Sequence, residues 1–114
     1  TEIILLDEPT TYLDLAHQLE VLELLKYLNE AENRTIVMVI HDLNHAARFA
    51  DYIVAMKDGV IIKEGAAKEV MTPPVLRDVF NIDAEMGVDP RTKKPICLTY
   101  NLMKEENVLK EMIL

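Results

Sequence analysis

Glycine and cysteine are scarce in this sequence, which has three glycines and one cysteine among its 114 residues. None of the glycines (Gly59, Gly65 and Gly87) lies in a G-x-x-x-x-G-K-[ST] context, so these residues contain no phosphate-binding loop of that type. The single Cys97 cannot form a disulfide within the chain, which is typical of a reducing compartment. Its apolar neighbours indicate a small core residue rather than a reactive thiol.

Basic residues and long apolar runs are also few. Lys and Arg number 12 against 20 Asp and Glu, which gives a net charge of −8 at pH 7. This balance disfavours nucleic acid as a partner, because its binding depends on Lys and Arg that neutralise phosphates. No apolar run approaches the roughly 18 residues that suggest a membrane span. The sequence enters an apolar strand by Ile3, so we expect it to be a fragment of a longer protein.

The first half of the chain has the pattern of an α/β fold. Apolar runs at 2–6 and 35–40 predict two strands that are buried on both faces. Between them, leucines at spacings of three and four predict an amphipathic helix that ends near Asn33, with Asp14 as its N-cap. A short helix after Asp42 and a third strand follow. This alternation predicts parallel strands that are joined by crossover helices.

The second half predicts shorter elements. Asp58-Gly59 lies between two apolar runs and indicates a β-hairpin, whose second strand is VIIKEG. We expect helices at 66–71 and 72–81, and then two strands within 83–100 around an Asp-Pro turn. The last dozen residues could form an amphipathic helix, whose apolar side would consist of Val108, Leu109, Met112 and Ile113.

Three chemically capable residues follow the first two strands directly: Asp7, Glu8 and His41. Parallel strands that are joined by a crossover helix end at the same edge of a sheet, and ligands of open α/β sheets bind there. One carboxylate could hold a hydrated Mg²⁺, and the other could orient a water molecule or take its proton in a phosphoryl transfer. A bare acidic pair more often only ends a strand and solubilises it.

The segments LLDEPT, TYLD and His41-Asp42, together with the hairpin KDGVIIKEG, resemble the second half of an ABC-type ATPase. The resemblance implies the C-terminal part of a RecA-like P-loop NTPase core, with a small C-terminal extension. It implies that Asp7 is the Walker B aspartate, which holds Mg²⁺ through water, and that Glu8 is the catalytic carboxylate. Asp14 would belong to the D-loop at a dimer interface, and His41 would be the switch histidine that contacts the γ-phosphate of ATP.

The same resemblance implies partners and a location. These are a second ATPase subunit in a head-to-tail dimer, transmembrane permease subunits and, indirectly, a substrate-binding protein. The protein would be cytoplasmic and peripheral on the inner face of the cell membrane. We expect residues 1–71 to be the C-terminal half of the nucleotide-binding domain and residues 72–114 to be the extension. Because the Walker A loop and the signature motif are absent, we expect the 114 residues alone to be inactive.

A narrower resemblance concerns the cargo. DEPTTYLD, HDLNHAARFAD and the turn DPRTKKP are similar to the ATPases that import iron–siderophore complexes, haem or cobalamin. Tyr12 is bulky where many relatives have Ala, and Lys93-Lys94 stands where the turn commonly carries Gly. The alternatives are an ABC ATPase of another importer or of a non-transport process, or a catalytically dead binding or dimerisation module. His45 is expected to be a partly exposed helix residue rather than a metal ligand.

Overall fold

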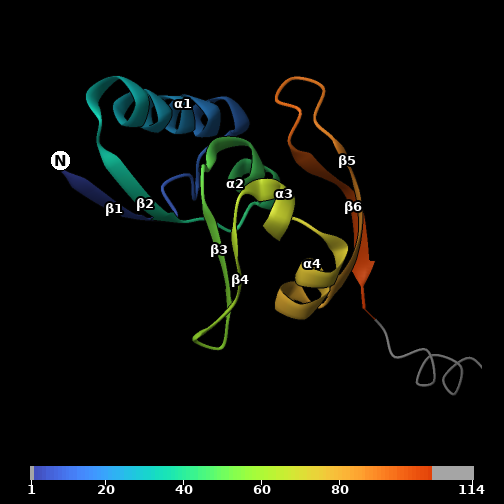
Figure 1. Ribbon diagram of the computed structural model, residues 1–114. Helices are drawn as coiled ribbons and strands as arrows, with labels where there is room; N and C mark the ends of the chain where they lie inside the picture. Colours follow the sequence, from blue (N-terminus) through green and yellow to red (C-terminus); the bar gives the residue numbers. More distant parts are fainter. Residues whose placement is uncertain (1, 104–114) are drawn as a thin grey trace, which may run out of the picture.

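The computed structural model describes residues 2–103 as an α/β fold (Figure 1). The predicted helix that contains Val108 and Leu109 lies outside the described residues. The elements, in chain order, are β1 (Ile3–Asp7), α1 (Leu15–Glu32), β2 (Thr35–Val39), α2 (Leu43–Phe49), β3 (Ile53–Lys57), β4 (Val60–Gly65), α3 (Ala67–Val70), α4 (Pro73–Phe80), β5 (Ile82–Val88) and β6 (Pro95–Leu102).

The unit β1–α1–β2 is the predicted crossover of two parallel strands. The strands pair in register from Ile3 with Thr35 to Asp7 with Val39. The Asp14 side chain caps α1 as expected, and it accepts a hydrogen bond from the His17 backbone N–H at 2.9 Å. The prediction of a parallel pair with a crossover helix is therefore confirmed, and α1 lies along this pair of strands in Figure 1.

Burial in this unit is less complete than predicted. Both strands were expected to be buried on both faces, but alternate apolar side chains are exposed in each of them, namely Ile3, Leu5, Val37 and Val39. Successive side chains of a strand point to opposite faces. Within residues 2–103 this sheet has two strands, and α1 covers one of its faces. A strand is buried on both faces only when each face has a cover, and the described residues cover one face of β1 and β2.

The strands β3 and β4 form the predicted hairpin and pair only with each other among the described residues. Its two-residue turn has Asp58 at φ 52° and Gly59 at φ 77°. Two positive φ angles are the requirement of a type I′ turn, and Asp-Gly satisfies this requirement well. The third strand was predicted to continue the parallel pattern, but within the described residues β3 pairs antiparallel with β4 and does not join the β1–β2 sheet.

The strands β5 and β6 form a second antiparallel hairpin around the Asp-Pro turn. Lys93 adopts the left-handed conformation (φ 63°) that would suit the glycine common at this position. The turn is closed by the Asp89 N–H, which donates to the Lys94 carbonyl at 2.8 Å. The Arg91 backbone N–H donates to the Asp89 carboxylate at 2.8 Å, and this bond lowers the pKa of Asp89. The turn therefore forms without glycine.

The main hydrophobic core lies where α2, α3 and α4 meet the β5–β6 hairpin. Its buried members are Ala47, Ala67, Met71, Leu76, Ile82, Ala84 and Cys97. Burial raises the pKa of the Cys97 thiol, which fits the predicted packing role. Residues on both sides of position 72 thus share one core. None of the helices within residues 2–103 has the length and apolarity needed to span a bilayer.

Candidate functional site

The carboxyl ends of β1 and β2 form one edge, at which the candidate residues gather. The parallel ladder continues one residue past β1, because the Glu8 N–H donates to the Val39 carbonyl at 2.8 Å. Asp7 is the last residue of β1 and is exposed. His41 follows β2 after a single residue, so the strand ends bring it next to the acidic pair.

Glu8 and His41 are in direct contact. One carboxylate oxygen of Glu8 (Oε1) pairs with Nε2 of the His41 imidazole. The other oxygen, Oε2, accepts a hydrogen bond from the Thr11 hydroxyl at 3.0 Å. Glu8 itself has a left-handed backbone (φ 49°), which turns the chain out of the strand. Both carboxylate oxygens of Glu8, the residue directly after β1, therefore have a partner.

The pair remains open to solvent. The His41 side chain is 71% exposed and that of Glu8 is 35% exposed. A shallow pocket of about 170 Å³ is lined by Glu8, His41 and the segment between β1 and α1. A water molecule takes up about 30 Å³ in the liquid, so this pocket can hold a few of them beside the carboxylate. The arrangement could orient a water molecule or accept its proton.

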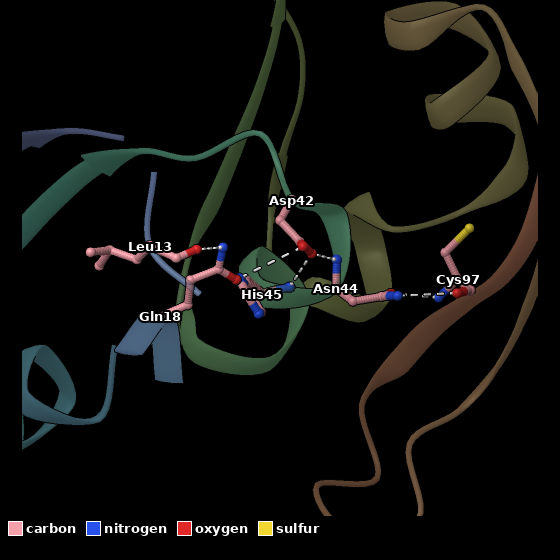
Figure 2. Close-up of polar contacts among 6 residues, drawn as sticks. All are labelled: Leu13, Gln18, Asp42, Asn44, His45 and Cys97. Atoms are coloured by element: carbon pink, nitrogen blue, oxygen red, sulfur yellow. Dashed lines mark hydrogen bonds and ion pairs between the residues drawn. The ribbon is translucent and has the colours of Figure 1, made fainter. Parts of the chain in front are cut away.

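The segment between β1 and α1 is ordered by its own contacts. Thr10 is buried, and Tyr12 is fully exposed with a left-handed backbone (φ 69°). The Gln18 side chain donates to the Leu13 carbonyl at 3.0 Å, as Figure 2 shows. Asp14 caps α1 and lies 2.7 Å from Nδ1 of His17. Asp14 is not part of the pocket lining, so it is placed apart from the Glu8–His41 pair.

The helix α2 starts directly after His41. The Asp42 carboxylate caps it by accepting hydrogen bonds from the backbone N–H groups of Asn44 and His45, each at 3.0 Å (Figure 2). The His45 side chain is 11% exposed, so it is a partly exposed helix residue as predicted. Its Nδ1 lies 3.7 Å from the second carboxylate oxygen of Asp42. His45 is therefore a packed helix residue.

Asp7 is the candidate for holding a metal ion. Mg²⁺ is commonly bound by one or two carboxylates, with water and substrate phosphate oxygens as its other ligands. The exposed Asp7 carboxylate at the strand end is compatible with this donor set. Within residues 2–103, no three His, Cys, Asp or Glu side chains gather as the ligands of a site made of protein alone. Asp7 fits a Mg²⁺ ion that is shared with a phosphate.

Sequence reasoning missed Thr11, which holds the Glu8 carboxylate, and Asn44, whose side chain reaches β6. Thr11 lies three residues after Glu8, a spacing at which a turn returns a hydroxyl to the carboxylate. That spacing is a weak but usable signal. The partner of Asn44 is the backbone of Cys97, 53 residues later in the sequence. No local pattern could have identified this contact.

No family model matches the chain, but individual known proteins match it in sequence. The iron(3+)-hydroxamate import ATP-binding protein FhuC of Bacillus subtilis (strain 168) is 67% identical over 109 residues, which are 96% of this chain and 40% of that protein. The petrobactin import ATP-binding protein FpuD of Bacillus anthracis is 52% identical over 112 residues, 98% of this chain and 40% of that protein. The chain thus spans about two fifths of the length of these relatives.

Solved structures match the fold. An inward-facing ABC transporter assigned to the metal-chelate type has a TM-score of 0.72 at 28% identity, over 86% of this chain and 41% of that one. A dimeric ATP-binding cassette with bound ADP and Pi has a TM-score of 0.53 at 44% identity, over 56% of this chain and 27% of that one. The predicted fold class, part of a RecA-like P-loop NTPase core, is therefore confirmed. In sequence and in fold, the chain matches part of the ATP-binding proteins of ABC transporters, and it resembles those of iron–siderophore importers.

Proposed function

We propose that this chain is part of the ATP-hydrolysing subunit of an ABC importer for iron–siderophore complexes or related metal chelates. The observation that carries the proposal is the contact between Glu8 and His41 at the carboxyl ends of two parallel strands. Relatives that are named for the import of iron(3+)-hydroxamate and petrobactin support the cargo. In this proposal, residues 1–71 are the C-terminal half of the nucleotide-binding domain and residues 72–114 are an extension.

Glu8 is proposed to act on the attacking water. Hydrolysis of ATP requires a water molecule to attack the γ-phosphorus and to lose a proton, and a carboxylate within hydrogen-bond reach assists both events. The Thr11 hydroxyl fixes one oxygen of the Glu8 carboxylate, and the adjoining pocket has room for the water. The carboxylate is thus oriented before the substrate arrives, which is the condition for efficient proton transfer.

His41 and Asp7 are proposed to serve the phosphate end of ATP. With a proton on each ring nitrogen, the exposed His41 side chain can donate from Nδ1 to a γ-phosphate oxygen while Nε2–H stays with Glu8 and orients the ring. Asp7 would hold Mg²⁺ through water molecules. When bound, the ion neutralises charge on the phosphate oxygens. The two neighbouring acids therefore have separate roles, Asp7 toward the metal and Glu8 toward the water.

The proposal includes partners. The exposed Tyr12 and the exposed cap residue Asp14 lie on a turn that is available to a second ATPase subunit. The dimeric solved neighbour with ADP and Pi supports a dimer, and the proposal takes this dimer to be head-to-tail. Transmembrane permease subunits and, indirectly, a substrate-binding protein complete the importer, which places the subunit on the cytoplasmic face of the membrane.

The proposal is tested by comparing ATP turnover of the longer protein with that of the 114 residues. We expect the longer protein to release phosphate from ATP in the presence of Mg²⁺. The 114 residues alone should show no turnover above background, because they contain no glycine-rich loop whose N–H groups could hold the phosphates. Turnover by the 114 residues would contradict this account. A longer protein that binds no nucleotide would favour a dimerisation module instead.

A further inference from the structure

The strand β6 is held to α2 by the side chain of Asn44. Its amide nitrogen Nδ2 donates to the Cys97 carbonyl at 3.1 Å, and the Cys97 N–H donates to Oδ1 of the same amide at 2.8 Å (Figure 2). A carboxamide presents a donor and an acceptor side by side, as a peptide group does. Asn44 therefore satisfies the backbone of an edge strand in the way a neighbouring strand would.

Lys94 forms a second link between the same two elements. Its ammonium group donates to the carbonyl of Arg48 at 3.0 Å and to that of Ala50 at 3.3 Å. These carbonyls end α2, where the last C=O groups of a helix lack intrahelical partners and a positive charge is favourable. Asn44 and Lys94 thus connect the β5–β6 hairpin to the first and the last turn of α2.

The helix α2 positions His41. Asp42 caps the helix and His41 immediately precedes this cap, so a shift of α2 moves the imidazole relative to Glu8. Packing on this side is incomplete, because a cleft of about 430 Å³ lies between the start of α2 and the hairpin, and His41, Phe80 and Tyr100 are among its lining residues. The hydrogen bonds of Asn44 cross to β6 beside this open space.

We propose that Asn44 and Lys94 are positioning residues, through which the β5–β6 hairpin fixes α2 and so holds His41 in place beside Glu8. This inference rests on the proposed ATPase function and deepens it, because it gives the extension a part in hydrolysis. The ammonium group of Lys94 reaches the end of α2 from the turn of the β5–β6 hairpin.

The test is the substitution Asn44→Asp in the longer protein. It keeps the shape of the side chain and the acceptor for the Cys97 N–H, but it places a carboxylate oxygen against the Cys97 carbonyl. We expect kcat for ATP to fall by about tenfold or more, because displacements on the order of 1 Å in an active site can cost a hundredfold. The KM for ATP should change by less than about twofold, since the loss concerns the chemical step rather than uniform binding.

Lys94→Met tests the second link, and Lys93→Met is its matched control at an exposed neighbour. We expect Lys94→Met to lower kcat, as Asn44→Asp does, and Lys93→Met to leave kcat unchanged. A lower pH should narrow the difference in kcat between Asn44→Asp and the unaltered protein. The introduced carboxyl group regains a hydrogen-bond donor when it is protonated. Loss of packing alone would not produce this pH dependence.

The outcomes separate the two proposals. An unaltered longer protein without ATP turnover overturns the proposed function, and this inference with it. An active protein in which Asn44→Asp and Lys94→Met both keep full kcat overturns the inference alone. If Asn44→Asp does not fold, as judged by its thermal unfolding, Lys94→Met decides the question by the same kcat measurement.

Discussion

Replacing Glu8 with glutamine in the longer protein is expected to lower ATP turnover by about 10² to 10⁴-fold, the usual loss when a general base is removed. Glutamine has nearly the same size, and its carbonyl oxygen can still accept the hydrogen bond from Thr11. It cannot accept a proton from the attacking water. Binding of ATP should therefore persist, which equilibrium binding and steady-state phosphate release can measure on the same preparation.

A matched variant separates this effect from a change in charge. Glu23→Gln alters an exposed acid on α1, away from the strand ends, and is expected to leave turnover unchanged. If Glu8→Gln also retained nearly full turnover, Glu8 would not be the base. Simultaneous loss of ATP binding would instead indicate that Glu8 serves mainly to hold nucleotide or metal.

The largest expected effect on stability comes from Leu76→Ala. The Leu76 side chain is 1% exposed and joins α4 to the core that α2, α3 and the β5–β6 hairpin share. Truncating a buried leucine removes apolar contacts and leaves a cavity, so we expect the free energy of unfolding to fall by about 2–5 kcal/mol. Urea unfolding followed by circular dichroism would measure the change.

Leu24→Ala is the control for this substitution. Leu24 is 57% exposed on α1, and alanine has the higher helix propensity, so the free energy of unfolding should change by no more than about 0.5 kcal/mol. Equal losses for the two variants would show that the shared core does not determine stability. An unfolding transition of Leu76→Ala in two separate steps would show that the residues before and after position 72 unfold independently.

The sequence predicted the parts of the fold that are encoded locally. Leucine periodicity identified α1, Asp-Gly identified the β3–β4 turn, and the crossover rule placed Glu8 and His41 at one edge. Leu5 and Val37 are exposed although the apolar runs predict burial on both faces, because the described residues cover one face of the β1–β2 sheet. The apolar pattern predicts a strand, but it does not predict what packs against the strand.

The candidate site was predictable to a similar extent. The roles of Asp7, Glu8, Asp14 and His41 came from motif resemblance and stay predictions, although Glu8 and His41 do meet in the structure. The role of Asn44 was not predicted, because its partners are backbone groups of Cys97 and no sequence pattern indicates such contacts. The boundary between residues 71 and 72 also stays a prediction, and the side chains on both sides of it pack into one core.

The central claim is that Glu8 and His41 act on one water and one phosphate as a unit, and a double-mutant cycle on kcat tests it most directly. The longer protein would be compared with Glu8→Gln, His41→Ala and the combination of the two. Residues that act as a unit give non-additive losses, so the double variant should be about as slow as the slower single variant. Losses that multiply would contradict the claim, because they would mean that the two side chains contribute independently.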